Sequence, residues 1–383
     1  MAATDRPFSL HLTNLAGTGA VQLAASLLPA LERAAGYRLE QLHLPDRGAL
    51  AGYRRSSDGP APIRYRRRLP NALSRVLECL APPRRFDGGT PLLVLGDLPL
   101  RCKTRQVVFV QTQHLVQGDR SGHRWAGLKY RIARALFAAN ARFADAYIVQ
   151  TDTMKAALEL TYPAVEGKVR VIPQPAPDWL LASGLRRPGR RADAGRALRL
   201  FYPAAAYPHK NHALLGQATP QPGAWPVESL LLTVAPEANP NAGLDWIRCV
   251  GVLSPEAMLT AYADVDALLF LSIAESYGFP LVEAMWIGLP IVCPDLPYAR
   301  SLCGDQALYF DPSCIQSLQR AIADLQQRLL AGWWPDWSAR RIGLPRDWDA
   351  VAAAMLETVF APTGEAAAAL ARRRAGPHRN ENA

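Results

Sequence analysis

The chain has 383 residues, 49% of them hydrophobic, and a net charge of +10. That length is enough for two domains with separate cores, and the composition excludes a disordered or fibrous chain. The basic balance favours phosphate-bearing partners, a class that includes nucleic acid, anionic lipid and nucleotides. No apolar run is long enough for a membrane span, the N-terminus has no signal-peptide pattern, and the six cysteines are scattered. We therefore expect a cytoplasmic protein with reduced thiols.

Strand and helix signals alternate through the first half of the chain, which predicts a parallel sheet covered by helices. The expected strands are 8–13, 38–44, 92–95, 107–111, 146–149 and 168–172, and the expected helices are 20–35, 123–143 and 151–160. Gly17 and Gly19, at the start of the first helix, would let the backbone approach a ligand, although a simple tight turn explains them nearly as well. His114 follows the carboxyl end of a strand, where ligand contacts gather in such sheets, and a hydrogen-bonded structural histidine is the equal alternative.

Two segments of this half are rich in basic residues. Residues 45–70 contain many prolines, glycines and arginines and fit either a solvated loop or an electrostatic contact with anionic lipid. In 123–143, Trp125, Leu128 and Ile132 recur at steps of three or four among basic residues, which is the pattern of a basic amphipathic helix. Either the apolar face packs inside a domain or the helix binds an anionic membrane surface. No nucleic-acid partner is expected, because aromatic and basic residues do not interleave on a recognisable module.

A Gly- and Arg-rich stretch at 183–197 is the best linker in the sequence, and strand signals resume after it. The expected strands are 198–202, 227–235, 245–250, 267–273, 290–293 and 304–312, and the expected helices are 213–218, 255–262, 313–330 and 347–360. Lys210 lies at the first transition from strand to helix, where an ammonium group can reach phosphate oxygens. An ordinary exposed lysine is the alternative.

Residues 266–295 form the most informative stretch of the chain. An apolar run leads into a turn with Glu275 and Gly278, a helix is expected to begin near Pro280, and Glu283 follows one turn later. The N-terminus of a helix attracts phosphate, and carboxylates accept hydrogen bonds from the paired hydroxyls of a ribose or hexose. The spacing alone fits a pair of solvated glutamates, but the G-F-P between them and the E-A-M-x-x-G-x-P that follows favour a ligand site.

This segment resembles the signature of retaining glycosyltransferases of family 4 (glycosyl transferases group 1), E-x-(F/Y)-G-(F/L)-P-x-x-E-A-M-x-x-G-x-P-V-(V/I). The resemblance implies an α/β fold of the GT-B type, with two Rossmann-like domains facing across a cleft. It implies a UDP- or GDP-sugar as donor substrate, no cofactor and no metal. The D-x-D at 264–266 precedes a core strand instead of following one, so we do not expect it to bind metal.

The same resemblance assigns roles to individual residues. Glu275 would hold the donor hexose and Glu283 the ribose, while Lys210 would grip the diphosphate. His114 would contact the acceptor or the donor hexose, and Gly17 and Gly19 would contact the acceptor or a phosphate. Further donor contacts are expected from Tyr277, Gly278, Phe279, Pro280, Leu281, His209 and Val252. Many similar chains carry an arginine where this chain has Ala205, and His209 or another basic residue is expected to replace its charge.

The predicted organisation is an acceptor-binding domain at 1–182, a linker at 183–197 and a nucleotide-sugar-binding domain at 198–345. A last helix at 346–361 is expected to pack back on the first domain, followed by a disordered tail at 362–383. The predicted function is retaining transfer of a hexosyl unit to a glycan or lipid-linked saccharide in cell-envelope polysaccharide synthesis, in the cytoplasm or at the inner face of the membrane. The alternatives are a non-catalytic nucleotide-sugar-binding subunit and a nucleotide-sugar epimerase or hydrolase on the same fold.

Overall fold

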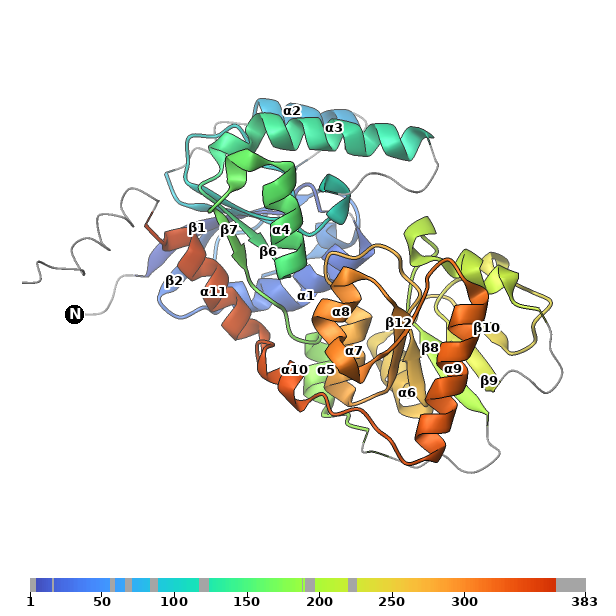
Figure 1. Cartoon of the computed structure of the whole chain (residues 1–383). Helices are drawn as coiled ribbons and strands as arrows, with labels where there is room; N and C mark the ends of the chain where they lie inside the picture. The colour runs from blue at the N-terminus through green and yellow to red at the C-terminus, as the bar shows by residue number, and fades with distance from the viewer. Residues whose placement is uncertain are drawn as a thin grey trace, which may run out of the picture.

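The computed structural model of the protein describes residues 5–15, 17–55, 59–65, 71–82, 89–116, 124–187, 189, 197–219 and 226–362. Two parallel sheets organise it, one from each half of the chain (Figure 1). The order in the N-terminal sheet is β3-β2-β1-β4-β5-β6-β7. Its strands are β1 (Arg6–His11), β2 (Tyr37–Pro45), β3 (Ile63–Tyr65), β4 (Leu92–Val94), β5 (Gln106–Phe109), β6 (Ala146–Val149) and β7 (Val169–Val171).

The C-terminal sheet has the order β10-β9-β8-β11-β12-β13. Its strands are β8 (Leu198–Tyr202), β9 (Val227–Leu232), β10 (Ile247–Cys249), β11 (Ala267–Leu269), β12 (Ile291–Pro294) and β13 (Leu308–Phe310). The apolar run from Ala267 to Leu271 is buried throughout, as expected of a strand covered on both faces. The strand order reverses between β8 and β11, and ligands of open α/β sheets bind beyond the carboxyl ends of the strands at such a point.

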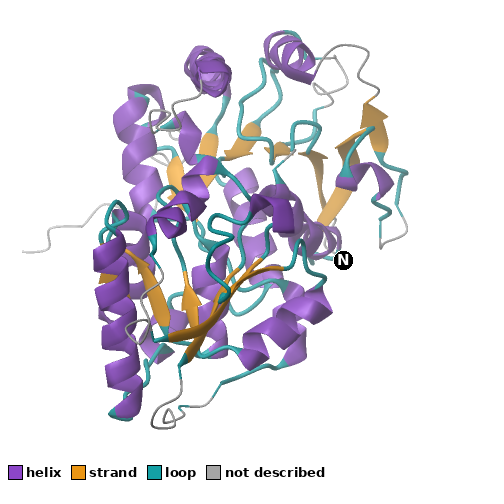
Figure 2. Ribbon diagram, turned by 90° about the vertical axis from the view of Figure 1, so that its right-hand side faces the viewer, coloured by secondary structure: helices purple, strands orange, loops and turns teal. Residues whose placement is uncertain are grey.

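Helices pack beside both sheets (Figure 2). In the first half they are α1 (Thr18–Glu32), α2 (Asn71–Leu80), α3 (Arg124–Asn140), α4 (Asp152–Thr161) and α5 (Asp178–Ser183). In the second half they are α6 (Pro255–Asp264), α7 (Phe279–Ile287), α8 (Pro297–Cys303), α9 (Ile315–Leu330), α10 (Ser338–Ile342) and α11 (Trp348–Phe360). Within the described residues, no helix combines the length and apolar character needed to cross a bilayer.

Helix α11 packs on the N-terminal domain, against α1. Trp348 is 1% exposed and lies in the N-terminal core with Val351, Met355 and Val359. Its indole N–H donates to the carbonyl oxygen of Ala176 at 3.0 Å. The last helix thus joins the two halves of the chain, as the resemblance implies.

Some local predictions differ from the structure. The expected α-helix at 213–218 is a 3-10 segment, His212–Gln217, which follows Asn211 in the left-handed region at φ 57°. Strand β3 lies within 45–70, where only a loop was expected, and α2 was not predicted. Ala176 and Leu180 belong to the C-terminal core, so by packing the change of domain falls earlier than the expected linker at 183–197.

Candidate functional site

The loops after β8 and β11 place two charged side chains together at the point where the strand order reverses. The Lys210 ammonium forms a salt bridge with Glu275 Oε1, and both side chains are mostly buried, 16% and 13% exposed. Lys210 ends a short 3-10 turn, Pro208–Lys210, and its carbonyl oxygen accepts from the Tyr202 hydroxyl at 2.8 Å. The two residues that sequence analysis assigns to the donor diphosphate and hexose are therefore direct neighbours.

Backbone hydrogen bonds fix these two loops to each other. The carbonyl oxygen of His209 accepts from the Ile273 amide at 2.8 Å and from the Ser272 hydroxyl at 3.1 Å. The Tyr298 hydroxyl donates to the carbonyl oxygen of Ser272. Because the loops are bonded to each other directly before Lys210 and Glu275, the pair is held in place before any ligand binds.

Helix α7 begins directly after the Glu275 turn. Gly278 precedes the helix at φ 90°, in the left-handed region that glycine tolerates best, so Pro280 occupies the second helical position and not the first. The Leu281 amide donates to the Gly278 carbonyl at 2.9 Å, and Pro280 has no N–H. Of the expected donor contacts between Gly278 and Leu281, Gly278 and Phe279 are thus the two whose backbone amides are suited to bind sugar or phosphate.

Glu283, in the second turn of α7, is a buried acid. The residue is 6% exposed, and its Oε2 accepts from the Tyr262 hydroxyl of α6 at 2.5 Å. Burial raises the pKa of Glu283 to about 7, and the hydrogen bond from Tyr262 opposes that rise. A carboxyl group with a pKa near neutrality can either accept or donate a hydrogen bond to a sugar hydroxyl, depending on pH.

Tyr277 connects the Glu275 turn to the N-terminal half of the chain. It is 1% exposed, and its hydroxyl accepts from the Gln174 amide at 2.9 Å and donates to the Gln174 carbonyl. Thr151, at the start of α4, also donates to the carbonyl of Ser276 at 3.4 Å. Tyr277, which was expected to contact the donor, therefore has its hydroxyl bonded to the backbone of the N-terminal half of the chain.

His114 and His209 meet between the two domains. Their ring centroids are 5.6 Å apart in an edge-on arrangement, and the His114 ring stacks on Tyr130 of α3 at 4.1 Å. Tyr207 stacks on the other side of His209 at 5.6 Å. The structure thus brings the expected acceptor histidine to the loop that carries Lys210.

The positive charge expected of His209 is not available near neutral pH. Burial, together with the charge of Lys210, lowers the pKa of His209 to about 4. Its imidazole is therefore neutral at pH 7 and can offer a phosphate one N–H but no charge.

The remaining predicted contacts lie on open surface. Gly17 caps α1, and a Cβ at Gly17 or Gly19 would meet no atom within 4 Å, so both positions leave space for a ligand. Val252 follows β10 and is 92% exposed. Asp266 of the D-x-D accepts from the Arg199 amide at 2.8 Å, which gives it a structural role. Among the described residues, no cluster of three or more His, Cys, Asp or Glu could hold a metal.

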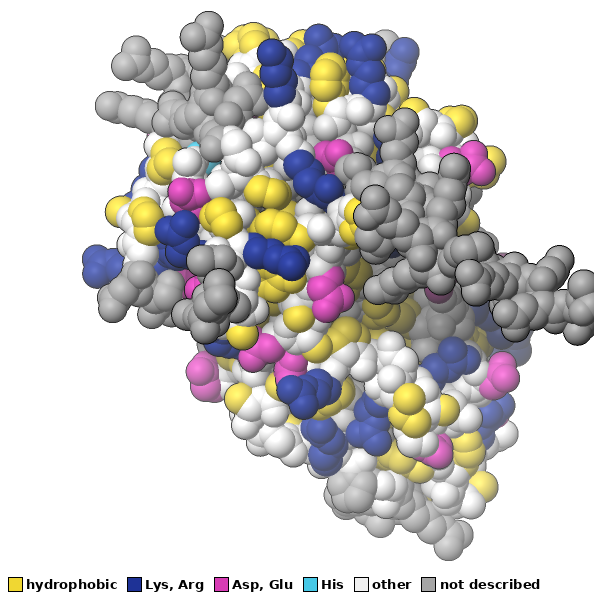
Figure 3. Space-filling view, turned by 90° about the vertical axis from the view of Figure 1, so that its left-hand side faces the viewer, with side chains coloured by type: hydrophobic (Ala, Val, Ile, Leu, Met, Phe, Trp, Pro, Cys, Tyr) yellow, Lys and Arg dark blue, Asp and Glu magenta, His cyan; other side chains and the backbone are white. Residues whose placement is uncertain are grey.

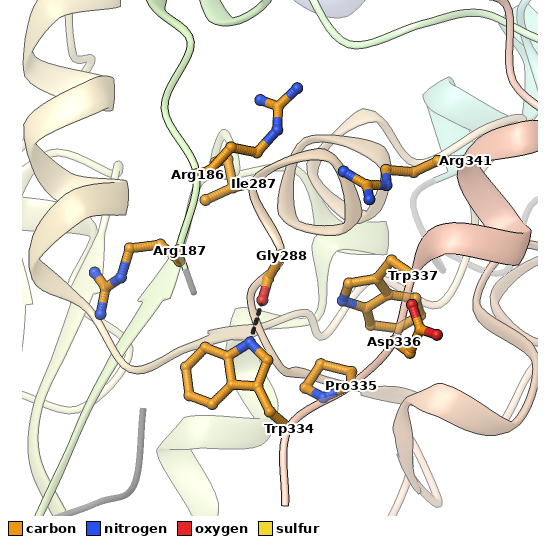
Figure 4. Close-up of a pocket in the computed structure, with 9 residues that line it drawn as sticks. All are labelled: Arg186, Arg187, Ile287, Gly288, Trp334, Pro335, Asp336, Trp337 and Arg341. Carbon is orange, nitrogen blue, oxygen red and sulfur yellow. Dashed lines mark hydrogen bonds between the residues drawn. The ribbon is translucent and has the colours of Figure 1, made fainter. Parts of the chain in front are cut away.

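A separate hollow of about 480 Å³ lies at the far end of α7, away from the Lys210–Glu275 pair (Figure 4). Its walls include Trp334, whose indole N–H donates to the Gly288 carbonyl at 2.7 Å, and Trp337, whose indole N–H donates to the Leu289 carbonyl at 2.9 Å. Both bonds hold the residues that end α7. The tryptophans that line the hollow therefore support the helix, and the hollow is not part of the candidate site.

Comparison with known proteins agrees with the motif and with the fold. Residues 240–328 match the family model described as "Glycosyl transferases group 1". Over 100 residues the chain is 30% identical to the serotype-specific mannosyltransferase WbdA of Escherichia coli. This match covers 26% of this chain and 12% of WbdA. Over 96 residues it is 29% identical to the O-antigen chain mannosyltransferase B of Escherichia coli, covering 25% of this chain and 24% of that protein. The matched part thus spans a quarter or less of these relatives.

Solved structures resemble the chain over nearly its whole length. Sucrose-phosphate synthase from Thermosynechococcus elongatus superposes with a TM-score of 0.62 at 17% identity, covering 92% of this chain and 98% of that one. WaaG, a glycosyltransferase involved in lipopolysaccharide biosynthesis, superposes with a TM-score of 0.59 at 14% identity. The superposition covers 93% of this chain and 100% of WaaG. The chain therefore has the GT-B fold, and its segment with Glu275 and Glu283 lies within the residues that match the glycosyl transferases group 1 model.

Proposed function

We propose that the protein transfers a hexosyl unit from a UDP- or GDP-sugar to a glycan or lipid-linked saccharide, with retention of configuration and without a metal. The observation that carries the proposal is the Lys210–Glu275 pair beside the N-terminus of α7. In such a site Glu275 accepts hydrogen bonds from the hexose, and Lys210 and the Gly278 and Phe279 amides face the diphosphate. Charge that develops on the leaving oxygens is then met by groups already in place.

In the proposed reaction, the bond between the anomeric carbon and the diphosphate oxygen breaks, and the acceptor oxygen bonds to the same face of the sugar. The acceptor proton passes to the departing phosphate oxygen, so no separate base is needed. A mechanism through two carboxyl groups, as in glycosidases, is disfavoured because Glu275 is paired with Lys210 and Glu283 is bonded to Tyr262.

Relatives guide the choice of donor and acceptor. The curated relatives are named as mannosyltransferases of O-antigen chains, which makes mannose the first hexose to test and an envelope polysaccharide the first acceptor class. A structural neighbour, HepE from Anabaena, was solved with UDP and glucose, at a TM-score of 0.59 and 15% identity, and it adds UDP-glucose to the donors to test. A lipid-linked acceptor would bring the enzyme to an anionic membrane at its cytoplasmic face.

A donor panel tests the proposal. UDP- and GDP-sugars are added singly in thermal-shift measurements, because a ligand that binds only the folded state raises its melting temperature. The donor that binds is then incubated with saccharide acceptors, and the anomeric configuration of the product is read by NMR. Transfer with retention in the presence of a chelator supports the proposal. Binding without transfer, or conversion of the donor without acceptor, would overturn it in favour of a binding subunit or an epimerase.

A further inference from the structure

The outer faces of α2 and α3 carry exposed aliphatic side chains. Leu73 and Leu77 of α2 are 50% and 47% exposed, and Leu128 and Ile132 of α3 are 45% and 44% exposed. The members of each pair are four residues apart, so each pair lies on one face of its helix. The helices contact each other and lie side by side at the top of Figure 1. We call these two outer faces the α2–α3 surface.

The exposed stripe of α3 is apolar over three turns. Ala135 and Ala139 are also exposed, so positions 128, 132, 135 and 139 form one stripe at helical spacing. A surface helix of a globular domain ordinarily buries such a stripe and shows its polar side to water. Here α3 buries Phe137 and Asn140 on its inner side and leaves this second apolar stripe uncovered.

The charge of the α2–α3 surface is positive. Helix α3 contains four basic residues and no acidic one, and Lys129 and Arg131 are exposed beside the apolar stripe. The charged residues of α2 face inward instead, since Arg75 donates to the Asn14 carbonyl at 2.6 Å and Glu78 accepts from the Thr13 hydroxyl at 2.6 Å. Figure 3 shows basic and hydrophobic side chains together at the upper edge of the molecule, the edge formed by these helices in Figure 1.

We propose that the α2–α3 surface docks on an anionic lipid membrane. Aliphatic side chains would enter the boundary of the acyl chains while Lys129 and Arg131 meet the headgroup phosphates, which is how basic amphipathic helices lie at an interface. Positive charge flanking an apolar stripe is complementary to the surface of an anionic lipid membrane.

The inner sides of the same helices reach the predicted acceptor contacts. Tyr130 of α3 stacks on His114, and Arg75 of α2 is bonded to the loop that precedes Gly17. Docking would therefore hold the acceptor side of the N-terminal domain next to the headgroups. The inference deepens the proposed function, and it rests on that function only for the nature of the acceptor, since docking is measured without any transfer.

Flotation of the whole protein with vesicles tests the proposal. Vesicles of phosphatidylcholine alone are compared with vesicles of equal parts phosphatidylcholine and phosphatidylglycerol. We expect binding to the anionic vesicles that weakens as salt is raised, because salt screens the headgroup charge. Replacing both Lys129 and Arg131 by Gln should weaken partition by about fivefold for each charge removed. The double variant Leu128→Gln with Ile132→Gln should lose about tenfold or more, the scale for withdrawing two partly buried aliphatic side chains from the apolar phase.

Matched controls lie elsewhere on the surface. Leu160→Gln removes an aliphatic side chain of α4 that is 86% exposed, and Arg248→Gln removes an exposed charge of β10, so both should bind vesicles like the wild type. Leu73→Gln with Leu77→Gln repeats the test on α2, should the α3 variants lose their circular-dichroism signal. Equal flotation with both vesicle types, or variants that bind as the wild type does, would overturn the proposal. So would self-association that these variants abolish without changing vesicle binding, since the surface would then join two copies of the chain.

Discussion

Replacing Glu283 by Gln should make the protein more stable at alkaline pH. The folded-state pKa of Glu283 is about 7, raised from 4.5 by burial. Between these two values the folded chain holds a proton that the unfolded chain has lost, so stability falls as pH rises through this range. This difference in pKa corresponds to a loss of ~3 kcal/mol in the free energy of unfolding. The loss is complete above the folded-state pKa and absent below the unfolded-state pKa. Gln carries no charge at any pH, and its amide oxygen can still accept from Tyr262.

Urea unfolding followed by tryptophan fluorescence measures this effect. Near pH 8 the Glu283→Gln variant should be more stable than the wild type by up to about 3 kcal/mol, and near pH 5 the two should differ by less than about 1 kcal/mol. Glu237→Gln is the matched control, because Glu237 is exposed on a 3-10 turn and its replacement should leave the pH dependence unchanged. Parallel stability curves for the wild type and Glu283→Gln would refute the reasoning, since the buried carboxyl would then carry no ionisation penalty.

Two further substitutions test other parts of the site, and a third tests the contact between the two domains. Lys210→Ala should lower turnover by about a hundredfold, the scale for one preorganised group facing a developing charge, and Lys168→Ala, before β7, should leave the rate unchanged in a steady-state assay. Gly278→Ala should destabilise the protein by about 1–2 kcal/mol in urea, because φ is 90° and the new Cβ would lie 3.3 Å from Leu281 Cδ1. Trp348→Ala should cost about 3–5 kcal/mol, because the indole is buried and bonded to Ala176; a smaller loss would show that α11 does not hold the two domains together.

The elements that sequence analysis located correctly are those with a signal within a few residues. Strands β6 and β8 were predicted with the bounds that the structure shows, because each is a short, mostly apolar run bounded by turn residues. The starts of α4 and α11 were predicted to within one residue, and in the structure Thr151 and Asp347 cap these helices by accepting from the amide three residues on, at 3.1 and 2.9 Å. The turn at Glu275 was found in the same way, since its glycine, proline and glutamates lie within nine residues.

The contacts that escaped prediction join residues far apart in sequence. Tyr262 and Glu283 are 21 residues apart on different helices, and Tyr277 meets Gln174 across 103 residues. No local pattern marks Tyr262 as the partner of Glu283, or Gln174 as the partner of Tyr277. Helix α2 escaped for a related reason, because Leu73 and Leu77 face outward while Cys79 is fully buried, so its pattern does not resemble that of a helix packed in a core.

If the protein binds a nucleotide sugar as proposed, Lys210 must balance more of the diphosphate charge than the lysine does in similar chains that also carry an arginine at the position of Ala205. Ala205 occupies the position where many such chains carry that arginine, and His209 does not restore the charge, because its pKa of about 4 leaves it neutral. A neutral N–H bonded to phosphate contributes about 0.5–1.5 kcal/mol, whereas a charged donor contributes about 1.5–3 kcal/mol. The positive charge beside Glu275, the carboxylate proposed to hold the hexose, is therefore that of Lys210. Glu275 already balances this charge in the structure. A bound donor would need to turn Glu275 toward the sugar hydroxyls before the full charge of Lys210 faced the diphosphate, so hexose recognition and stabilisation of the leaving group depend on the same ion pair.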